Sequence, residues 1–564
     1  MINAEGFFLM NDPRGSMWRK WDLHLHAPLT KLNNNYKIED KGDLWELYCN
    51  KIEQSDVVGF GITDYFSVDN YFIFIDKFTK LFPNSTKVFF PNIEFRLEVS
   101  VNLKAEEVNL HVIFSNIIPK IKIDEFLGKL DTNITSNAAT VSCKSLNDSQ
   151  ISSACIDYKQ LRTKLKEVFG NDECYLIFAA ANNQGLRPDN GSLRKLVITD
   201  EIDKVCDGFF GGSQNVDHFL KLDRFENNEQ SRPKPVLSCS DAHSFDEIDN
   251  WLGKQFVRRS NGSQIIEKNV TWIKADLTFE GLKQITYEPK DRVFIGDEPE
   301  ILKRVKSNKT KYIRSLEFKK VVNSNLTNEI WFDKNEKINV NPGFVSIIGN
   351  KGSGKSALAD TLGLLGDTKQ SDHFSFLNDS KFKNKKDNKA KNFNAIIEWE
   401  SGDPSEKNLN DEVNENAVET IKCIPQNYLE SICTEQLEGS LFNNELKKVI
   451  FSHIGTTEKL NFNSLDDLIR FKTKEKGNTI DIVKSEIANL NTEIAILEKK
   501  LHPDYRTLIN NKLQIKKLEK ETHEKVKPEE KTKPVIGVDQ KNETEEITTS
   551  INEKVKNIIE CEKK

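Results

Sequence analysis

Two histidines two residues apart mark the first place in this sequence where side chains could do chemistry, in "WRKWDLHLHAP" at residues 18–28. In an extended strand successive side chains point to opposite faces, so His24 and His26 share one face while Leu23 and Leu25 share the other. Two imidazoles on one face converge on one point, which suits a metal ion. An isolated pair of this kind is more often an accident of a half-polar strand, so the rest of the chain must decide.

Further carboxylates and imidazoles follow short apolar runs later in the chain. The carboxyl ends of parallel strands share one rim of an α/β fold, and ligand sites form there. Imidazoles and carboxylates gathered on such a rim are the ligands that Zn²⁺, Mn²⁺ and Fe prefer, so the sequence predicts a divalent metal centre. The candidates are Asp64 in "GITDYFS", Glu94 in "FPNIEF", His111 in "NLHVIF", and Asp241 and His243 in "LSCSDAHS".

The elements that must position these residues lie between about 18 and 295. Short apolar runs of strand type alternate there with amphipathic helical stretches. This alternation predicts an α/β domain with largely parallel strands. Residues 131–155 are small and polar and are expected to form a surface excursion.

The motifs "DLHLH", "GITD", "IEF", "LHVIF" and "CSDAH" resemble, in order and approximate spacing, those of the PHP (polymerase and histidinol phosphatase) superfamily. The resemblance covers residues 18–295 and implies a metal-dependent phosphoesterase on a distorted (β/α)₇ barrel. The phrases "GSMWRKWDLHLHAP" and "TWIKADLTFEGLKQITYEP" also resemble the TrlF-type family, in which such a domain is fused to an SMC-like ATPase.

The resemblance implies a role for each candidate. His24, His26 and Asp241 would hold one metal, Glu94 would bridge to a second, and His111 would complete part of that second site. His243 would serve a third metal, and Asp64 would be a ligand or would orient one. A bridged metal pair lowers the pKa of bound water toward about 7 and supplies hydroxide to a phosphorus centre. The implied catalytic residues are His24, His26, Glu94, Asp241 and His243.

Two departures from the family pattern reduce the expected number of metals. Tyr65 stands where a histidine is usual after "TD", and Asn182, in "AAANNQG", stands where another is usual. One or two metals are therefore expected rather than three, unless His218 or a water substitutes. Arg187 in "GLRPDN" could bind a phosphate through two of its guanidinium N–H groups, but a surface arginine is the favoured interpretation.

A glycine-rich loop, "VSIIGNKGSGKSALAD" at 345–360, carries the G-x-x-x-x-G-K-S pattern of a P-loop. It is expected between an apolar strand and a helix, the context that this motif requires. Its backbone N–H groups would wrap the phosphates of ATP, Lys355 would reach the terminal phosphates and Ser356 would bind Mg²⁺. The predicted nucleotide-binding residues are Gly349, Asn350, Lys351, Gly352, Ser353, Gly354, Lys355, Ser356 and, farther on, Gln426.

Gln426 lies in "IKCIPQNYLE", which resembles the Q-loop of ABC-type and SMC-type ATPases. From Ile480 to Leu501 the apolar residues then alternate at spacings of three and four, which predicts a coiled-coil seam. The order P-loop, Q-loop and coiled coil resembles the amino-terminal half of an SMC-like head. The sequence has no signature motif and no Walker B strand, so it suggests an incomplete polypeptide that binds ATP and hydrolyses it poorly by itself.

Length and composition set the outer bounds. A chain of 564 residues is too long for one core, and three domains are expected: 1–297 (phosphoesterase), 298–472 (ATPase head) and 473–564 (coiled-coil arm). Residues 298–316 are basic and are expected to form the linker.

The formal net charge of −6 gives no global signal for polyanion binding. The nine cysteines lack any CxxC pair, and no apolar run is long enough for a membrane span, which predicts a reduced, cytoplasmic protein.

These observations favour a metal-dependent phosphoesterase acting on DNA or RNA. An SMC-like ATP-binding module would gate it in DNA repair or anti-phage defence, and a homodimer or higher oligomer would form through the head and the coiled coil. Two alternatives remain open: a phosphatase of nucleotides or small metabolites, and a degenerate scaffold or sensor whose activity resides in the ATPase.

Overall fold

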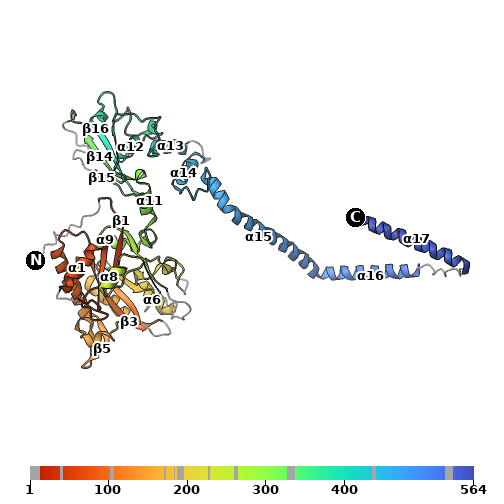
Figure 1. Cartoon of the computed structure of the whole chain (residues 1–564), viewed down its shortest axis with the longest axis horizontal. Coiled ribbons are helices and arrows are strands. Elements are labelled where there is room, and N and C mark those ends of the chain that lie inside the picture. The colour runs from red at the N-terminus through yellow and green to blue at the C-terminus, as the bar shows by residue number, and fades with distance from the viewer. Residues whose placement is uncertain are drawn as a thin grey trace. The chain divides into compact units, whose positions relative to one another are not determined.

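The computed structural model divides the chain into two compact units, Met1–Ser431 and Ile432–Lys564, which are described separately (Figure 1). The predicted boundaries after residues 297 and 472 stay predictions. The described residues are 13–38, 42–101, 107–170, 173–182, 185–186, 196–225, 229–259, 265–324, 326, 337–434, 440–526 and 538–563.

A nine-stranded sheet dominates the first unit, in the order β13-β12-β1-β2-β3-β4-β7-β8-β9. Its ends approach each other: the hydroxyl of Thr271 on β12 donates to the carbonyl of Ser238, just after β9, and accepts from the N–H of the same residue, both at 2.7 Å. The sheet is therefore nearly closed into a barrel. Its strands are β1 (Met17–His26), β2 (Val57–Tyr65), β3 (Val88–Ser100), β4 (Glu107–Phe114), β7 (Tyr175–Ala180), β8 (Gly208–Phe210), β9 (Val236–Leu237), β12 (Thr271–Ala275) and β13 (Val293–Ile295).

The expectation of largely parallel strands holds for only part of this sheet. Strands β1, β2 and β3 are mutually parallel, as are β7, β8 and β9, but β4 is antiparallel to both of its neighbours, and β12 is antiparallel to β1 and β13. The reason at β3 and β4 is the connection between Ser100 and Glu107, which is too short for the crossover that a parallel pair needs.

Helices cover the sheet (Figure 1). Two of them begin at aspartates that cap exposed N–H groups: Asp43 caps α1 and Asp157 caps α5. Apolar side chains from the helices are buried against the strands, as Tyr48, Phe74 and Leu161 are. The helices are α1 (Leu44–Gln54), α2 (Asp69–Leu81), α3 (Lys120–Lys129), α4 (Asp148–Ile151), α5 (Tyr158–Phe169), α6 (Leu196–Val205), α7 (Val216–Phe219), α8 (Phe245–Trp251), α9 (Phe279–Lys283) and α10 (Pro289–Arg292).

The predicted surface excursion at 131–155 contains a short hairpin, β5 (Asp131–Ser136) and β6 (Ala139–Ser142), followed by α4. Its polar residues are largely exposed, but Cys143, Leu146 and Ile151 are buried in the main core. The excursion is thus anchored by a few apolar side chains. A second hairpin pairs β10 (Phe256–Arg259) with β11 (Ile265–Lys268).

A separate four-stranded antiparallel sheet follows, in the order β15-β14-β16-β17. Its central strand β14 begins at Ile313, so the final residues of the predicted linker belong to this sheet, and Leu316 is buried in its core. The elements are α11 (Glu300–Ser307), β14 (Ile313–Lys320), β15 (Lys337–Asn339), α12 (Lys355–Leu365), β16 (Phe393–Trp399), β17 (Pro404–Asn408) and α13 (Gln426–Thr434).

The apolar strand expected before the glycine-rich loop is not formed. Residues 344–348 belong to no strand of the described sheets, and Phe344 and Ile348 are 90% and 89% exposed. An apolar run becomes a strand only where a neighbour takes up its backbone hydrogen bonds, and the described part of the chain supplies none here. The helix expected after the loop is present as α12.

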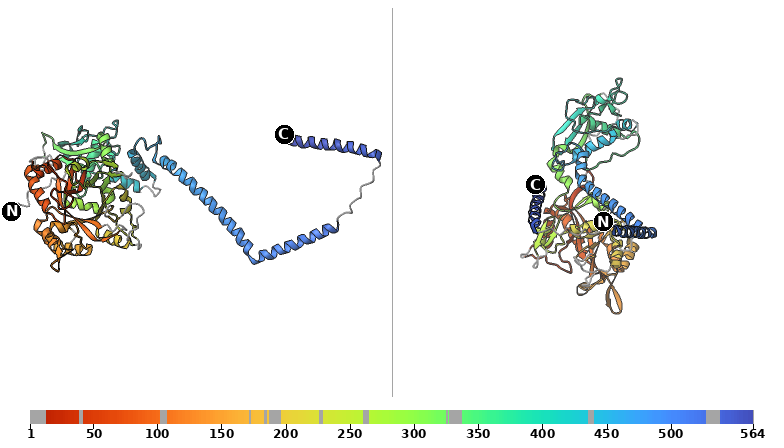
Figure 2. Two further views of the ribbon diagram at one scale, coloured as in Figure 1. Left: turned by 60° about the horizontal axis from the view of Figure 1, so that its bottom comes forward. Right: turned by 90° about the vertical axis from the view of Figure 1, so that its right-hand side faces the viewer.

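The second unit contains long helices (Figure 2). Ser464 caps α15, and Pro503 occupies the first turn of α16, where its missing N–H costs nothing. The seam residues Ile487, Leu490 and Ile494 are each about half exposed, so the coiled coil stays a prediction. The helices are α14 (Ser440–His453), α15 (Leu465–Leu501), α16 (Pro503–Lys525) and α17 (Val538–Glu562).

The eight cysteines whose side chains the structure describes form no disulfide bond. Cys49, Cys143 and Cys206 are buried, whereas Cys561 on α17 is exposed. Among the helices that the structure describes, none combines the length and the apolar character needed to cross a bilayer.

Candidate metal centre

Strands β1, β3 and β4 and one turn bring most of the sequence-predicted ligands together. His24 and His26 lie at the end of β1, Glu94 on β3 and His111 on β4. Glu94 and His111 are paired directly across the antiparallel β3–β4 ladder. Asp241 comes from the turn after β9, with a φ of 51°.

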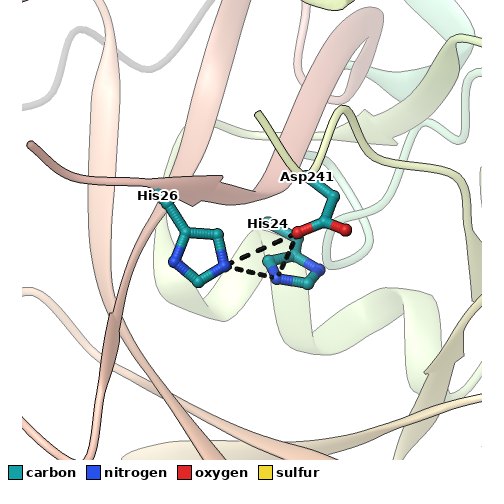
Figure 3. Close-up of side chains that lie close together, drawn as sticks. All are labelled: His24, His26 and Asp241. Carbon is teal, nitrogen blue, oxygen red and sulfur yellow. Dashed lines mark hydrogen bonds and ion pairs between the residues drawn. The ribbon is translucent and has the colours of Figure 1, made fainter. Parts of the chain in front are cut away.

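The donor atoms of His24, His26 and Asp241 lie close to one another (Figure 3), and Glu94 lies against the two imidazoles. The Nε2 atoms of His24 and His26 are 3.1 Å apart, and each is 3.2 Å from Oε2 of Glu94. Oδ1 of Asp241 is 3.2 Å from His24 Nε2 and 3.5 Å from His26 Nε2. A tetrahedral ion with bonds of ~2.0–2.1 Å holds its ligand atoms about 3.3 Å apart, so the separations among His24, His26 and Asp241 suit three ligands of one ion.

His24, Glu94 and His111 form a second group whose ligand atoms lie within 4.8 Å of one another, beside the group of His24, His26 and Asp241. The two groups share His24, and Glu94 contacts members of both. All of these side chains except Asp241 are buried, so the charges have little solvent to screen them.

The electrostatics of the cluster favour a cation. Burial alone would lower the pKa of His26, but the carboxylates of Asp241 and Glu94 outweigh it and raise that pKa to about 9. Burial favours the neutral form of Glu94, yet the imidazoles of His24 and His26 hold its pKa well below the usual range. Burial lowers the pKa of His111 to about 3, so this imidazole is neutral, which is the form that binds a metal.

The residues fit a divalent metal. Nδ1 of His111 is buried and has no hydrogen-bond partner among the described residues, which would be costly for a purely structural histidine. The donors are imidazole nitrogens and carboxylate oxygens, the set that Zn²⁺, Mn²⁺ and Fe accept.

Two predicted ligands lie outside both groups. The Asp64 carboxylate accepts from the N–H of Tyr65 at 2.9 Å and from the Asn70 amide at 3.0 Å, and burial raises its pKa to about 6. Both ring nitrogens of His243 are engaged: Nδ1 is 2.9 Å from the carbonyl of Asp241, and Nε2 is 3.1 Å from the Tyr65 hydroxyl.

The positions that depart from the family pattern bond to their own neighbours. Tyr65 stacks on His26, with ring centroids 4.7 Å apart, as well as contacting His243. The Asn182 amide donates to Asn215 Oδ1 at 2.7 Å. His218 lies on α7 and in neither group, and Arg187 lies outside the described residues.

Two supporting residues escaped the sequence argument. The Asn109 amide donates to Oε1 of Glu94 at 2.7 Å, and the buried carboxylate of Asp22 accepts from the N–H of His24 at 3.2 Å. Asn109 precedes His111 by two residues and Asp22 precedes His24 by two, so each shares a strand face with a ligand. This two-residue spacing is the feature of the sequence that could have identified Asn109 and Asp22 as supporting residues.

The glycine-rich loop leads into α12 with left-handed backbone at Gly352 (φ 87°) and Gly354 (φ 93°). The Lys355 ammonium donates to the carbonyls of Gly349 at 2.7 Å and Asn350 at 2.9 Å. Gln426 is the first residue of α13, and its amide donates to Glu430.

Comparisons with known proteins give one distant likeness to report. Neither a protein-family profile nor a curated protein sequence matches the chain. Among solved structures, a two-domain protein from Bacteroides vulgatus ATCC 8482, described as containing a predicted PHP-like metal-dependent phosphoesterase, is similar at 11% sequence identity. The match covers 56% of this chain and 82% of that one, with a TM-score of 0.30.

Proposed function

We propose that the barrel is a metal-dependent phosphoester hydrolase of the PHP type. The observation that carries this proposal is the cluster of donor atoms from buried His24, His26 and Glu94 and from partly exposed Asp241, with separations of 3.1–3.5 Å between the imidazoles and their neighbours. The second group, through His111, supports a binuclear centre.

In this proposal His24, His26 and Asp241 hold one ion, and Glu94 and His111 hold a second beside it. Divalent ions bound there would lower the pKa of a coordinated water toward about 7 and neutralise charge on the phosphoryl oxygens. Asn109 fixes one oxygen of Glu94, which leaves the other directed at the two imidazoles. The Tyr65 hydroxyl and His243 form a hydrogen-bonded wall beside His26.

We further propose that the substrate is DNA or RNA and that residues 349–356 bind ATP and Mg²⁺. The open glycine-rich turn at the start of α12 supports nucleotide binding, because N–H groups at a helix start attract phosphate. The same proposal includes the TrlF-type and SMC-like assignments, Gln426 as a nucleotide sensor, and a role in DNA repair or anti-phage defence. It also includes a cytoplasmic location and a homodimer or higher oligomer formed through the ATPase head and the coiled coil.

Two competing functions have specific support. The acidic net charge of −6 favours a small phosphoester, such as a nucleotide, over a nucleic acid. Tyr65 and Asn182, at positions where a PHP enzyme usually has histidine, favour a domain that senses rather than cleaves.

The test is hydrolysis of labelled single- and double-stranded DNA and RNA, and of a chromogenic phosphomonoester and phosphodiester, in Mn²⁺, Zn²⁺ or EDTA. The full chain is compared with His26→Ala and, as a matched control, His218→Ala. We expect metal-dependent polymer cleavage that His26→Ala loses by at least ~100-fold and His218→Ala retains.

Other results would redirect the assignment. Cleavage of the monoester alone would support the small-phosphoester function. A chain that binds metal and cleaves none of these substrates would contradict the hydrolase proposal and favour the sensor.

A further inference from the structure

Asp22 is a buried carboxylate that the proposed chemistry does not use. It lies on β1 two residues before His24 and is 3% exposed. Oδ1 accepts from the N–H of His24 at 3.2 Å, and Oδ2 accepts from the N–H of Ser240 at 2.8 Å. One side chain thus bonds to the backbone on both sides of the cluster.

The segment that Asp22 holds is the one that delivers Asp241. Strand β9 ends at Leu237, so Asp241 is carried by a turn rather than by the sheet ladder. Two backbone bonds attach this turn to β1: the Asp241 N–H donates to the His24 carbonyl at 2.9 Å, and the His26 N–H donates to the Ala242 carbonyl at 3.2 Å.

Asp241 itself has a left-handed backbone, with a φ of 51°. Such a conformation is sparsely populated for residues other than glycine and persists where the surroundings fix it. The Asp22–Ser240 bond fixes the residue immediately before it. In this position Asp241 directs Oδ1 to within 3.2 Å of His24 Nε2.

We infer that Asp22 is a positioning residue for the metal centre, which sets the separation between the His24–His26 pair and the Asp241 carboxylate by bonding to the backbone of both segments. The inference rests on the proposed metal centre. Asp22 is not itself placed as a ligand, because both oxygens of Asp22 are already engaged by backbone N–H groups. Its effect on the metal therefore runs through the placement of Asp241.

The test measures Zn²⁺ and Mn²⁺ affinity of the full chain by competition with a chromogenic chelator. In Asp22→Asn an amide NH₂ replaces one oxygen, so a donor faces the N–H of His24 or of Ser240. We expect metal affinity to fall about 10- to 100-fold, as for residues that orient metal ligands. Asp56→Asn is the matched control. Asp56 is an exposed aspartate that pairs with Lys20, and Lys20 lies on β1 as Asp22 does.

The same substitution is then made in an Asp241→Ala background. If Asp22 acts through Asp241, Asp22→Asn should change the affinity of that variant by less than about twofold. An equal loss in both backgrounds, or wild-type affinity in Asp22→Asn, would overturn the inference. Should Asp22→Asn fail to fold, Asp22→Glu, whose longer side chain displaces the carboxylate from the N–H groups of His24 and Ser240, is measured in both backgrounds against the same criterion.

These readouts separate the inference from the proposed function. Metal bound with the expected dependence on Asp22, but with no phosphoester cleaved, would contradict only the function. Cleavage that depends on metal and is indifferent to Asp22 would contradict only the inference.

Discussion

Single residues define the charge of the metal centre. The carboxylates of buried Glu94 and partly exposed Asp241 lie against the imidazole of His26, and a proton on His26 balances part of their charge. A metal ion must replace this proton, because only the neutral imidazole is a ligand.

Metal affinity should therefore depend on pH. The carboxylates of Asp241 and Glu94 raise the pKa of His26 to about 9, so below pH 9 each ion bound at this residue displaces one proton. We expect apparent affinity to rise about tenfold per pH unit up to pH 9 and to level off above it. Calorimetry in buffers of different ionisation enthalpy measures the released proton; affinity that stays constant between pH 6 and 8 would contradict the prediction.

His243→Ala tests whether His243 is a ligand. Its two ring nitrogens are taken by the Asp241 carbonyl and the Tyr65 hydroxyl, so we expect the variant to bind as many metal equivalents as the wild type. Elemental analysis after gel filtration gives the number, with His24→Ala as the variant that should lose metal. Loss of one equivalent in His243→Ala would make it a ligand.

The sequence predicts which of these residues share a strand face, because side chains alternate between the two faces along a strand. His24 and His26 share a face because they are two apart on a strand, and that much follows from the sequence alone. Asp64 shows the limit: it follows the same kind of apolar run, but its oxygens bond to Tyr65 N–H and to Asn70, which is a matter of local turn geometry. Spacing along the chain does not reveal which partner a carboxylate chooses.

At the scale of elements, α12 is fixed to the loop that follows it by one aspartate. Asp360 is buried, and its Oδ2 accepts from the N–H groups of Phe376 and Leu377 at 2.6 and 3.1 Å. This loop carries Phe374 and Leu377 into the core of the second sheet.

Removing this carboxylate should destabilise that region. Asp360→Ala leaves two N–H groups without their acceptor, and we expect a loss of about 2–4 kcal/mol, whereas Asp360→Asn, which keeps one oxygen, should lose less. Urea unfolding followed by the tryptophan fluorescence of the full chain measures the difference. Equal stability of the alanine variant and the wild type would show that water replaces the carboxylate.

Whether an apolar run becomes a strand depends on partners that the run itself does not specify. The short connection between β3 and β4 makes that pair antiparallel, which was readable from its length. Residues 344–348 are as apolar as β7, yet β7 is paired on both sides and 344–348 are not. Composition therefore predicted both runs as strands and could not distinguish them.

The apolar seam residues of α15 lead to a testable prediction about self-association of the chain. Burial of Ile487 and Leu490 against a second helix would remove the exposure that both now have. We expect the full chain to self-associate and Leu490→Asp to weaken this by at least ~10-fold, while Ser485→Asp, on the same helix but outside the seam, does not. Analytical ultracentrifugation over a concentration series decides; a wild-type monomer throughout would contradict the prediction.

At the scale of the whole molecule, one chain carries a proposed metal centre and a proposed nucleotide-binding loop. The metal ligands lie on the nine-stranded sheet and its adjoining turn, whereas Lys355 begins α12 beside the four-stranded sheet. Separate cores hold these two sheets. Their ligands should therefore be separable by mutation.

We expect Lys355→Ala to lose ATP binding by at least ~10-fold and to keep its full complement of metal, and His26→Ala to do the reverse. Fluorescent-nucleotide titration and elemental analysis on the same preparations measure both properties. Loss of both ligands in either variant would mean that the two sites depend on each other.

The unequal exposure of the cysteines gives a route to watching the helical arm move. Burial raises the pKa of Cys143 and Cys206 well above the usual range, so these thiols react slowly with maleimides, whereas Cys561 on α17 is open to solvent. With Cys174, Cys239, Cys423 and Cys433 replaced by serine, one dye at Cys561 and a second at an engineered surface site would report the distance between the arm and the barrel in solution, molecule by molecule, as nucleotide and metal are added.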